Sequence, residues 1–225
     1  MRAGRQATFL YSIFAALFTF GVVDADAQDP VRLGPYVVDV RFSLPYYGQD
    51  PFVAMQRELV PFQLPARGVG INVGAHVYPL RLGAVTLGIG VEALASRGSR
   101  KPLLEELEIT VDETTEDPLA PIVTRFDSIS PQVSFNFGGT TGWSYLSGGL
   151  GPTTFSVAAA GVEDRGERRF SAVNYGGGGR WFPKDHLAVS LDLRFYSISP
   201  QEETDELPGI GRMTLMVFSI GVSIK

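Results

Sequence analysis

Six charged residues lie in segments where polar and apolar residues alternate, and they are the first candidates for chemistry. Three are acidic and three are basic: Asp39, Glu92, Asp192, Arg41, Arg180 and Arg194. Such a balanced set can form a network of ion pairs and hydrogen bonds, or it can line a path for ions or protons. Because an unpaired charge in a narrow enclosed space is costly, we expect a structural charge network, with a gated pore as the alternative.

Support for catalysis is thin. Acid–base or nucleophilic chemistry needs a histidine beside a serine or an acid, with a third group that orients it. The chain has two histidines, His76 and His186, and Asp185 precedes the second in a predicted turn, where solvated polar residues are ordinary. No phosphate loop or nucleotide fingerprint is present. We therefore expect no enzyme activity, no catalytic residues and no cofactor.

Two acidic segments, 97–124 and 200–211, are candidates for metal binding. Carboxylate oxygens are calcium ligands, but neither segment has the regular Asx spacing followed by glycine that a calcium loop requires. The chain also has no cysteine, which excludes thiolate metal sites, disulfides and a lipid anchor on cysteine. We expect solvated charge runs on exposed loops and no metal site.

The elements that must position these residues are strands. Period-two alternation of apolar and polar residues predicts eight of them, at 36–45, 67–78, 84–96, 125–138, 143–157, 170–182, 186–199 and 212–225. Short links (79–83, 139–142 and 183–185) alternate with long ones (46–66, 97–124, 158–169 and 200–211). An even strand count with short turns at one end and long loops at the other is typical of bacterial outer-membrane barrels. The predicted fold is all-β: an eight-stranded antiparallel up-and-down transmembrane β-barrel.

Alternation alone does not say which face is inside, since a soluble barrel would turn its apolar face inward. Two features favour the membrane arrangement. The polar face consists mainly of Gly, Ser, Thr and Asn rather than Lys and Glu, and aromatic residues gather near strand ends, where membrane barrels carry girdles. The predicted girdle comprises Tyr36, Tyr46, Tyr47, Tyr78, Phe137, Trp143, Tyr145, Phe170, Trp181, Phe182, Phe195 and Tyr196. Segment 46–66 is apolar enough to pack across the barrel mouth.

Two regions of the chain are distinguished by composition. Residues 1–27 have a positive start, an apolar core (Ala7–Val23) and a small-residue cleavage triplet (Ala25–Ala27), which predicts a cleaved signal peptide. Residues 28–225 are expected to form the barrel as one domain, with no appended domain. The net charge of −5 argues against nucleic acid as a partner, because nucleic-acid binding needs a basic surface.

Two segments carry a resemblance to a known family. The run Asn174–Phe182, followed by Asp185–Leu187 and Asp192–Arg194, resembles the closing hairpin of the OmpA/OmpX-like outer-membrane β-barrel family. Tyr145–Leu146 with Gly149–Gly151 resembles the preceding strand. The chain departs from the family at its end, Val222–Lys225, where many members carry the aromatic residue that the assembly machinery reads.

The predicted architecture suggests a location and a role, whereas the resemblance marks a barrel family and no activity. We expect a monomer in the outer membrane of a Gram-negative bacterium, with outer-membrane lipids, lipopolysaccharide and the assembly machinery as partners. The expected role is structural or interactive, in adhesion or envelope integrity, with four extracellular loops on a plugged barrel. The alternatives are a narrow channel for small or hydrophobic solutes, a soluble periplasmic ligand-binding barrel and, last, a lipid A-modifying enzyme.

Overall fold

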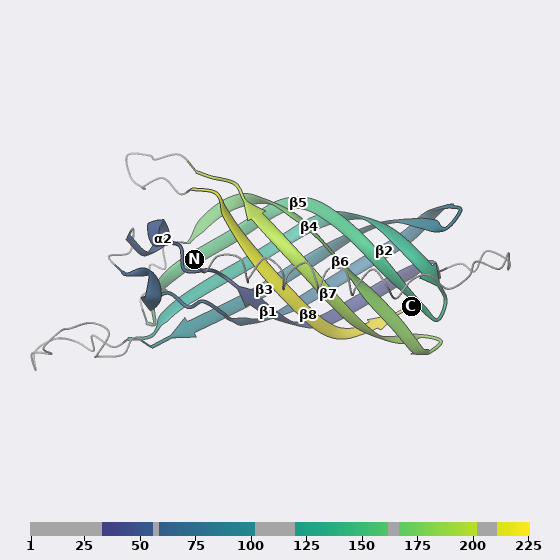
Figure 1. Cartoon of the computed structure of the whole chain (residues 1–225), viewed down its shortest axis with the longest axis horizontal. Coiled ribbons are helices and arrows are strands. Elements are labelled where there is room, and N and C mark those ends of the chain that lie inside the picture. The colour runs from purple at the N-terminus through teal and green to yellow at the C-terminus, as the bar shows by residue number, and fades with distance from the viewer. Residues whose placement is uncertain (1–32, 56–58, 102–119, 162–166, 202–210) are drawn as a thin grey trace, which may run out of the picture. The chain divides into compact units, whose positions relative to one another are not determined.

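The computed structural model describes residues 33–55, 59–101, 120–161, 167–201 and 211–225, and it has the predicted all-β fold. Its eight strands form a closed barrel in which each strand is antiparallel to its neighbours and β1 pairs with β8 (Figure 1). The strands are β1 (Tyr36–Tyr46), β2 (Val69–Leu82), β3 (Val85–Arg100), β4 (Ile122–Gly139), β5 (Gly142–Ala159), β6 (Arg168–Lys184), β7 (Leu187–Ile198) and β8 (Met213–Ile224). The predicted signal peptide and the acidic parts of the long loops lie outside the described residues.

All three predicted short links are shorter in the structure, and in two of them the preceding strand continues past a proline. The alternation ends at Pro79 and Pro183, yet β2 continues to Leu82 and β6 to Lys184. In each case the register shifts across the proline, between Val77 and Leu80 or between Trp181 and Lys184. A bulge tolerates proline because its extra residue leaves the hydrogen-bond ladder, so these strands pass a residue that normally ends a strand. The turn after β2 then includes Gly83, whose φ of 61° favours glycine.

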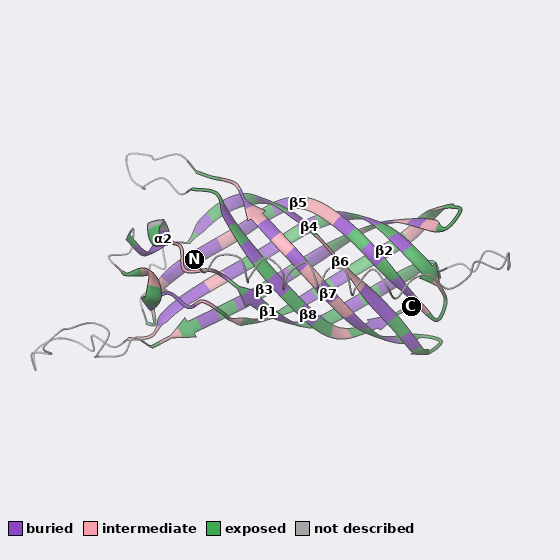
Figure 2. Cartoon of the chain, viewed as in Figure 1, coloured by how far each residue is buried: buried purple, intermediate pink, exposed green. Residues whose placement is uncertain are grey.

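The barrel wall is apolar outside and polar inside. Along β7 the outward positions are Leu187, Val189 and Leu191, and the intervening Ser190 and Asp192 are buried. Figure 2 shows the same alternation of buried and exposed residues on the other strands. This orientation is the inverse of a soluble ligand-binding barrel, where the apolar face is enclosed.

The interior is divided into three layers. At the long-loop end lies an apolar cluster that contains Phe126, Phe155 and Ile198, and at the short-turn end lies a second, mainly aromatic cluster. The second cluster is formed by Leu33, Val37, Tyr78, Trp143, Tyr145, Phe182 and Ala188. The polar and charged residues occupy the space between the two clusters.

Segment 46–66 enters the apolar cluster at the loop end. Asp50 accepts a hydrogen bond from the Val53 amide (3.2 Å) and so caps the short helix α2 (Pro51–Met55). The side chains of Val53, Ala54 and Leu64 are buried among inward-facing strand residues. This segment therefore packs into the barrel mouth, as its composition predicts.

The predicted aromatic girdle is wrong for most of its members. Five of the residues do face outward: Tyr36, Tyr46, Phe137, Trp181 and Phe195. The other seven occupy inward positions and belong to the two interior clusters: Tyr47, Tyr78, Trp143, Tyr145, Phe170, Phe182 and Tyr196. Position near a strand end does not fix the face of a side chain, because the face depends on the parity of the residue within the strand.

Candidate functional site

The six charged residues lie together in the middle layer of the barrel. β1 carries Asp39 and Arg41, β3 carries Glu92, β6 carries Arg180, and β7 carries Asp192 and Arg194. Each side chain occupies an inward position, and none of the six residues is more than 2% exposed. Four of the eight strands thus place one balanced set of charges in one enclosed space.

The first group of contacts is made to the carboxylate of Asp39. Arg180 donates two parallel hydrogen bonds to its carboxylate, from Nε to Oδ1 (2.8 Å) and from Nη2 to Oδ2 (2.6 Å). Arg41 approaches the same carboxylate with Nη2 2.8 Å from Oδ2. The Ser223 hydroxyl adds a hydrogen bond of 2.5 Å to Oδ1. One carboxylate therefore contacts two guanidinium groups, and its pair with Arg180 has the bidentate geometry that makes arginine–carboxylate pairs strong.

The second group of contacts is made by the guanidinium of Arg194. Its Nη2 lies 3.0 Å from Glu92 Oε2 and 3.2 Å from Asp192 Oδ2. The same guanidinium donates to Gln132 Oε1 (3.0 Å), Asn174 Oδ1 (3.0 Å) and Ser147 Oγ (2.8 Å). Arg41 joins the two groups because its Nη1 lies 2.9 Å from Glu92 Oε1. All six charges thus form one connected network.

The sequence patterns missed several members of this network. Tyr145 donates a hydrogen bond from its hydroxyl to Asp192 Oδ2 (2.7 Å), and its ring centroid lies 4.2 Å from Arg180 Cζ. Asn72, Gln132 and Asn174 satisfy further donors of Arg41 and Arg194. The alternation of polar and apolar residues in the sequence places Asn72 and Gln132 on the polar face of their strands. In the glycine-rich β5 and β6 the alternation is weaker, so it does not assign a face to Tyr145 or Asn174.

The two histidines lie in different surroundings. His76 is buried in β2, with Nδ1 3.9 Å from Asp39 Oδ2, and His186 is exposed in the turn before β7. The hydroxyl of Ser223 donates to Asp39 and not to a histidine. Among the described residues no serine is hydrogen-bonded to a histidine side chain, so the arrangement that activates a serine nucleophile is not present there.

The described residues contain no cluster of histidine and acidic side chains that could hold a metal ion. At the barrel mouth, the Tyr47 hydroxyl donates to Ser96 Oγ (3.1 Å). Burial raises the pKa of Tyr47 to about 12, so this hydroxyl keeps its proton at neutral pH. Tyr47 and Ser96 therefore form a neutral hydrogen bond at the barrel mouth.

No helix within the described ranges is long and apolar enough to cross a membrane. No family model matches the sequence, and no curated protein matches it either.

Among solved structures, Neisserial surface protein A matches with a TM-score of 0.50 at 12% identity, over 84% of this chain and 96% of that one. Ail, the attachment invasion locus protein of Yersinia pestis, matches with a TM-score of 0.45 at 12% identity, over 86% and 100%. The N-terminal β-barrel domain of Pseudomonas aeruginosa OprF matches with a TM-score of 0.42 at 11% identity, over 84% and 96%. The likeness to Neisserial surface protein A confirms the resemblance at the level of the fold: both chains form a small β-barrel, and this one is a closed barrel of eight antiparallel strands.

Proposed function

We propose that this chain is an outer-membrane protein of a Gram-negative bacterium whose barrel is plugged and whose role is structural or interactive. The barrel anchors the protein in the membrane and presents its long loops at the cell surface, in the service of adhesion or envelope integrity. The short turns face the periplasm. Outer-membrane lipids and the assembly machinery are its partners, and it works as a monomer without catalytic activity.

One observation supports the proposal that the barrel is plugged. The side chains of Arg41, Arg180 and Arg194 are the three largest that are fully buried in the described chain, although they lie on the axis along which solutes would travel. Apolar layers close the interior on both sides of them. An eight-stranded barrel is just wide enough for side chains to fill it, so the network serves as a plug rather than as the lining of a channel.

The plug predicts that the folded protein does not conduct ions. Purified protein inserted into a planar bilayer is expected to give no discrete conductance steps. Heat-modifiable mobility on a gel, measured on the same preparation, controls for correct folding. Discrete steps from heat-modifiable protein would contradict the plug and favour the narrow channel.

The membrane location predicts a large effect at the outer wall. Val73 on β2 is 44% exposed and has outward apolar neighbours, Val40 on β1 and Ala93 on β3. In a membrane, Val73→Arg would place a charge near the bilayer midplane and is expected to destabilise the protein by about 2–4 kcal/mol. The measurement is the denaturant unfolding free energy in lipid vesicles.

Ser171→Arg provides the matched control. Ser171 is also exposed on the outer wall, but it lies one outward position beyond Val173 towards the loop end of β6. Charge near an interface costs about 0–1 kcal/mol. Equal effects of the two substitutions would contradict the membrane location, because a water-exposed wall does not distinguish them.

A further inference from the structure

The outer wall changes character abruptly at the end that carries the long loops. The continuous run of outward apolar residues ends there at Val69 on β2, Ala95 on β3 and Ile129 on β4. Beyond them, the outward positions towards the loops carry Arg67, Arg97, Asp127 and Arg125. Positive charge thus gathers on β3, on β4 and just before β2, directly above the apolar wall.

Arg97 and Arg125 are placed opposite each other in the β3–β4 ladder. Like charges in directly paired positions repel each other and destabilise a sheet. Asp127 lies two residues from Arg125 on the same face, but within the described residues no carboxylate forms an ion pair with either arginine. A bound anion would remove this repulsion.

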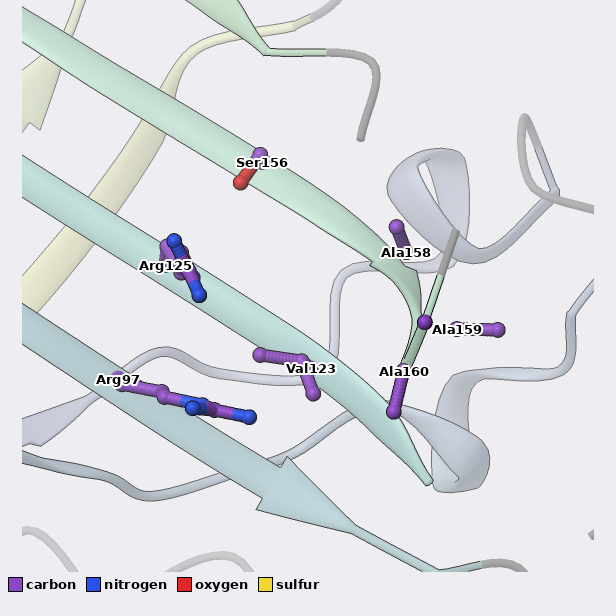
Figure 3. A pocket seen from close by; sticks show the side chains of 8 residues that line it. Arg97, Val123, Arg125, Ser156, Ala158, Ala159 and Ala160 are labelled. Carbon is purple, nitrogen blue, oxygen red and sulfur yellow. The ribbon is translucent and has the colours of Figure 1, made fainter. Parts of the chain in front are cut away.

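A small pocket adjoins the two guanidinium groups. Its volume is about 60 Å³, and Arg97, Val123, Arg125 and Ser156 line it together with the small residues 158–161 (Figure 3). This volume exceeds the roughly 10–15 Å³ that one water molecule needs on the same measure, so a single tetrahedral anion fits in the pocket. Two guanidinium groups and a hydroxyl are donors of the kind that recognise phosphate.

We propose that Arg97 and Arg125, with Ser156, bind the phosphate of a phosphorylated lipid headgroup in the outer leaflet. The position of the pocket selects a lipid as the source of the phosphate. A lipid whose acyl chains lie along Val69, Ala95 and Ile129 would bring its headgroup to the level of the arginines. Arg67, which lies just before β2 and bridges to Tyr46, adds positive charge at the same end of the barrel. The inference rests on the membrane location proposed above and deepens it, because it assigns residues to a lipid partner.

The test uses the folded full-length barrel in zwitterionic phosphatidylcholine vesicles. Binding of bisphosphorylated lipid A is compared with binding of its dephosphorylated form, for the wild-type protein and for the double variant Arg97→Gln/Arg125→Gln. Loss of charge-assisted hydrogen bonds to phosphate is expected to weaken binding of the phosphorylated form about tenfold. Binding of the dephosphorylated form should not change. Arg212→Gln, a charge removed at the same end of the barrel before β8, is the matched control and should bind like wild type.

Two outcomes would contradict the proposed site. If the wild-type protein and the double variant bind the phosphorylated lipid equally well, the two arginines do not recognise it. If an equal concentration of inorganic phosphate displaces the lipid, the site binds free phosphate and not a lipid headgroup. Failure of the wild-type protein to enter the vesicles at all would instead contradict the membrane location. Entry without preference for the phosphorylated lipid contradicts only this inference.

Discussion

Replacing Arg194 with alanine is expected to destabilise the folded barrel by about 3–5 kcal/mol, the usual effect of removing one partner from a buried ion pair. Arg194 balances Glu92 and Asp192 and donates to three neutral side chains, all of them inside the barrel. Its loss leaves an excess of negative charge in a buried space that lies between two apolar clusters. The measurement is the unfolding midpoint and slope in denaturant, with the protein in a neutral detergent.

Arg97→Ala is the matched control for this prediction. Arg97 has the same side chain, but it lies on the outer wall and forms no ion pair with any described residue. Surface substitutions of this kind usually change stability by less than about 0.5 kcal/mol. An unchanged midpoint for Arg194→Ala would mean that the network does not stabilise the barrel, and a path lined by hydrated charges would then fit better.

The barrel itself could be predicted from sequence because its two faces meet different surroundings. Where polar and apolar residues alternate strictly, as at Leu187–Tyr196, the type of each residue indicates whether its side chain faces the interior or the outside. The same parity places Asp39, Arg41 and Glu92 inside before any contact is known. Alternating link lengths add the antiparallel order. These signals are local, so a single sequence contains them.

The pairing of the charges could not be predicted in the same way. Asp39 and Arg180 are 141 residues apart, and they meet only because closure of the barrel brings β1 and β6 to face the same interior. The number of charges predicted a neutral set but did not say which arginine contacts which acid. Tyr145 joins the network for the same reason, since its contact with Asp192 crosses from β5 to β7.

The second large effect is expected at Asp39. Asp39→Asn removes the carboxylate that receives two hydrogen bonds from Arg180 and an ion pair from Arg41, and it keeps the size of the side chain. The amide is neutral, so the interior gains one uncompensated positive charge. A loss of about 3–5 kcal/mol in the unfolding free energy is expected, because the substitution breaks a buried pair and leaves the cation in place.

Removing the guanidinium of Arg180 together with the Asp39 carboxylate shows whether that loss comes from charge imbalance or from altered packing. Adding Arg180→Met to Asp39→Asn restores a balanced set, Glu92 and Asp192 against Arg41 and Arg194, and a flexible thioether fills much of the space of the guanidinium. Buried ion pairs replaced on both sides by neutral groups often cost little, so the double variant is expected to be more stable than Asp39→Asn alone. The coupling in the double-mutant cycle, measured by denaturant unfolding in neutral detergent, should be about 0.5–3 kcal/mol in the stabilising direction. Strictly additive losses would show that Asp39 acts through its shape and its bond to Ser223 rather than through charge balance. A stabilising coupling would identify electrostatic neutrality as the condition that the interior of this barrel must satisfy.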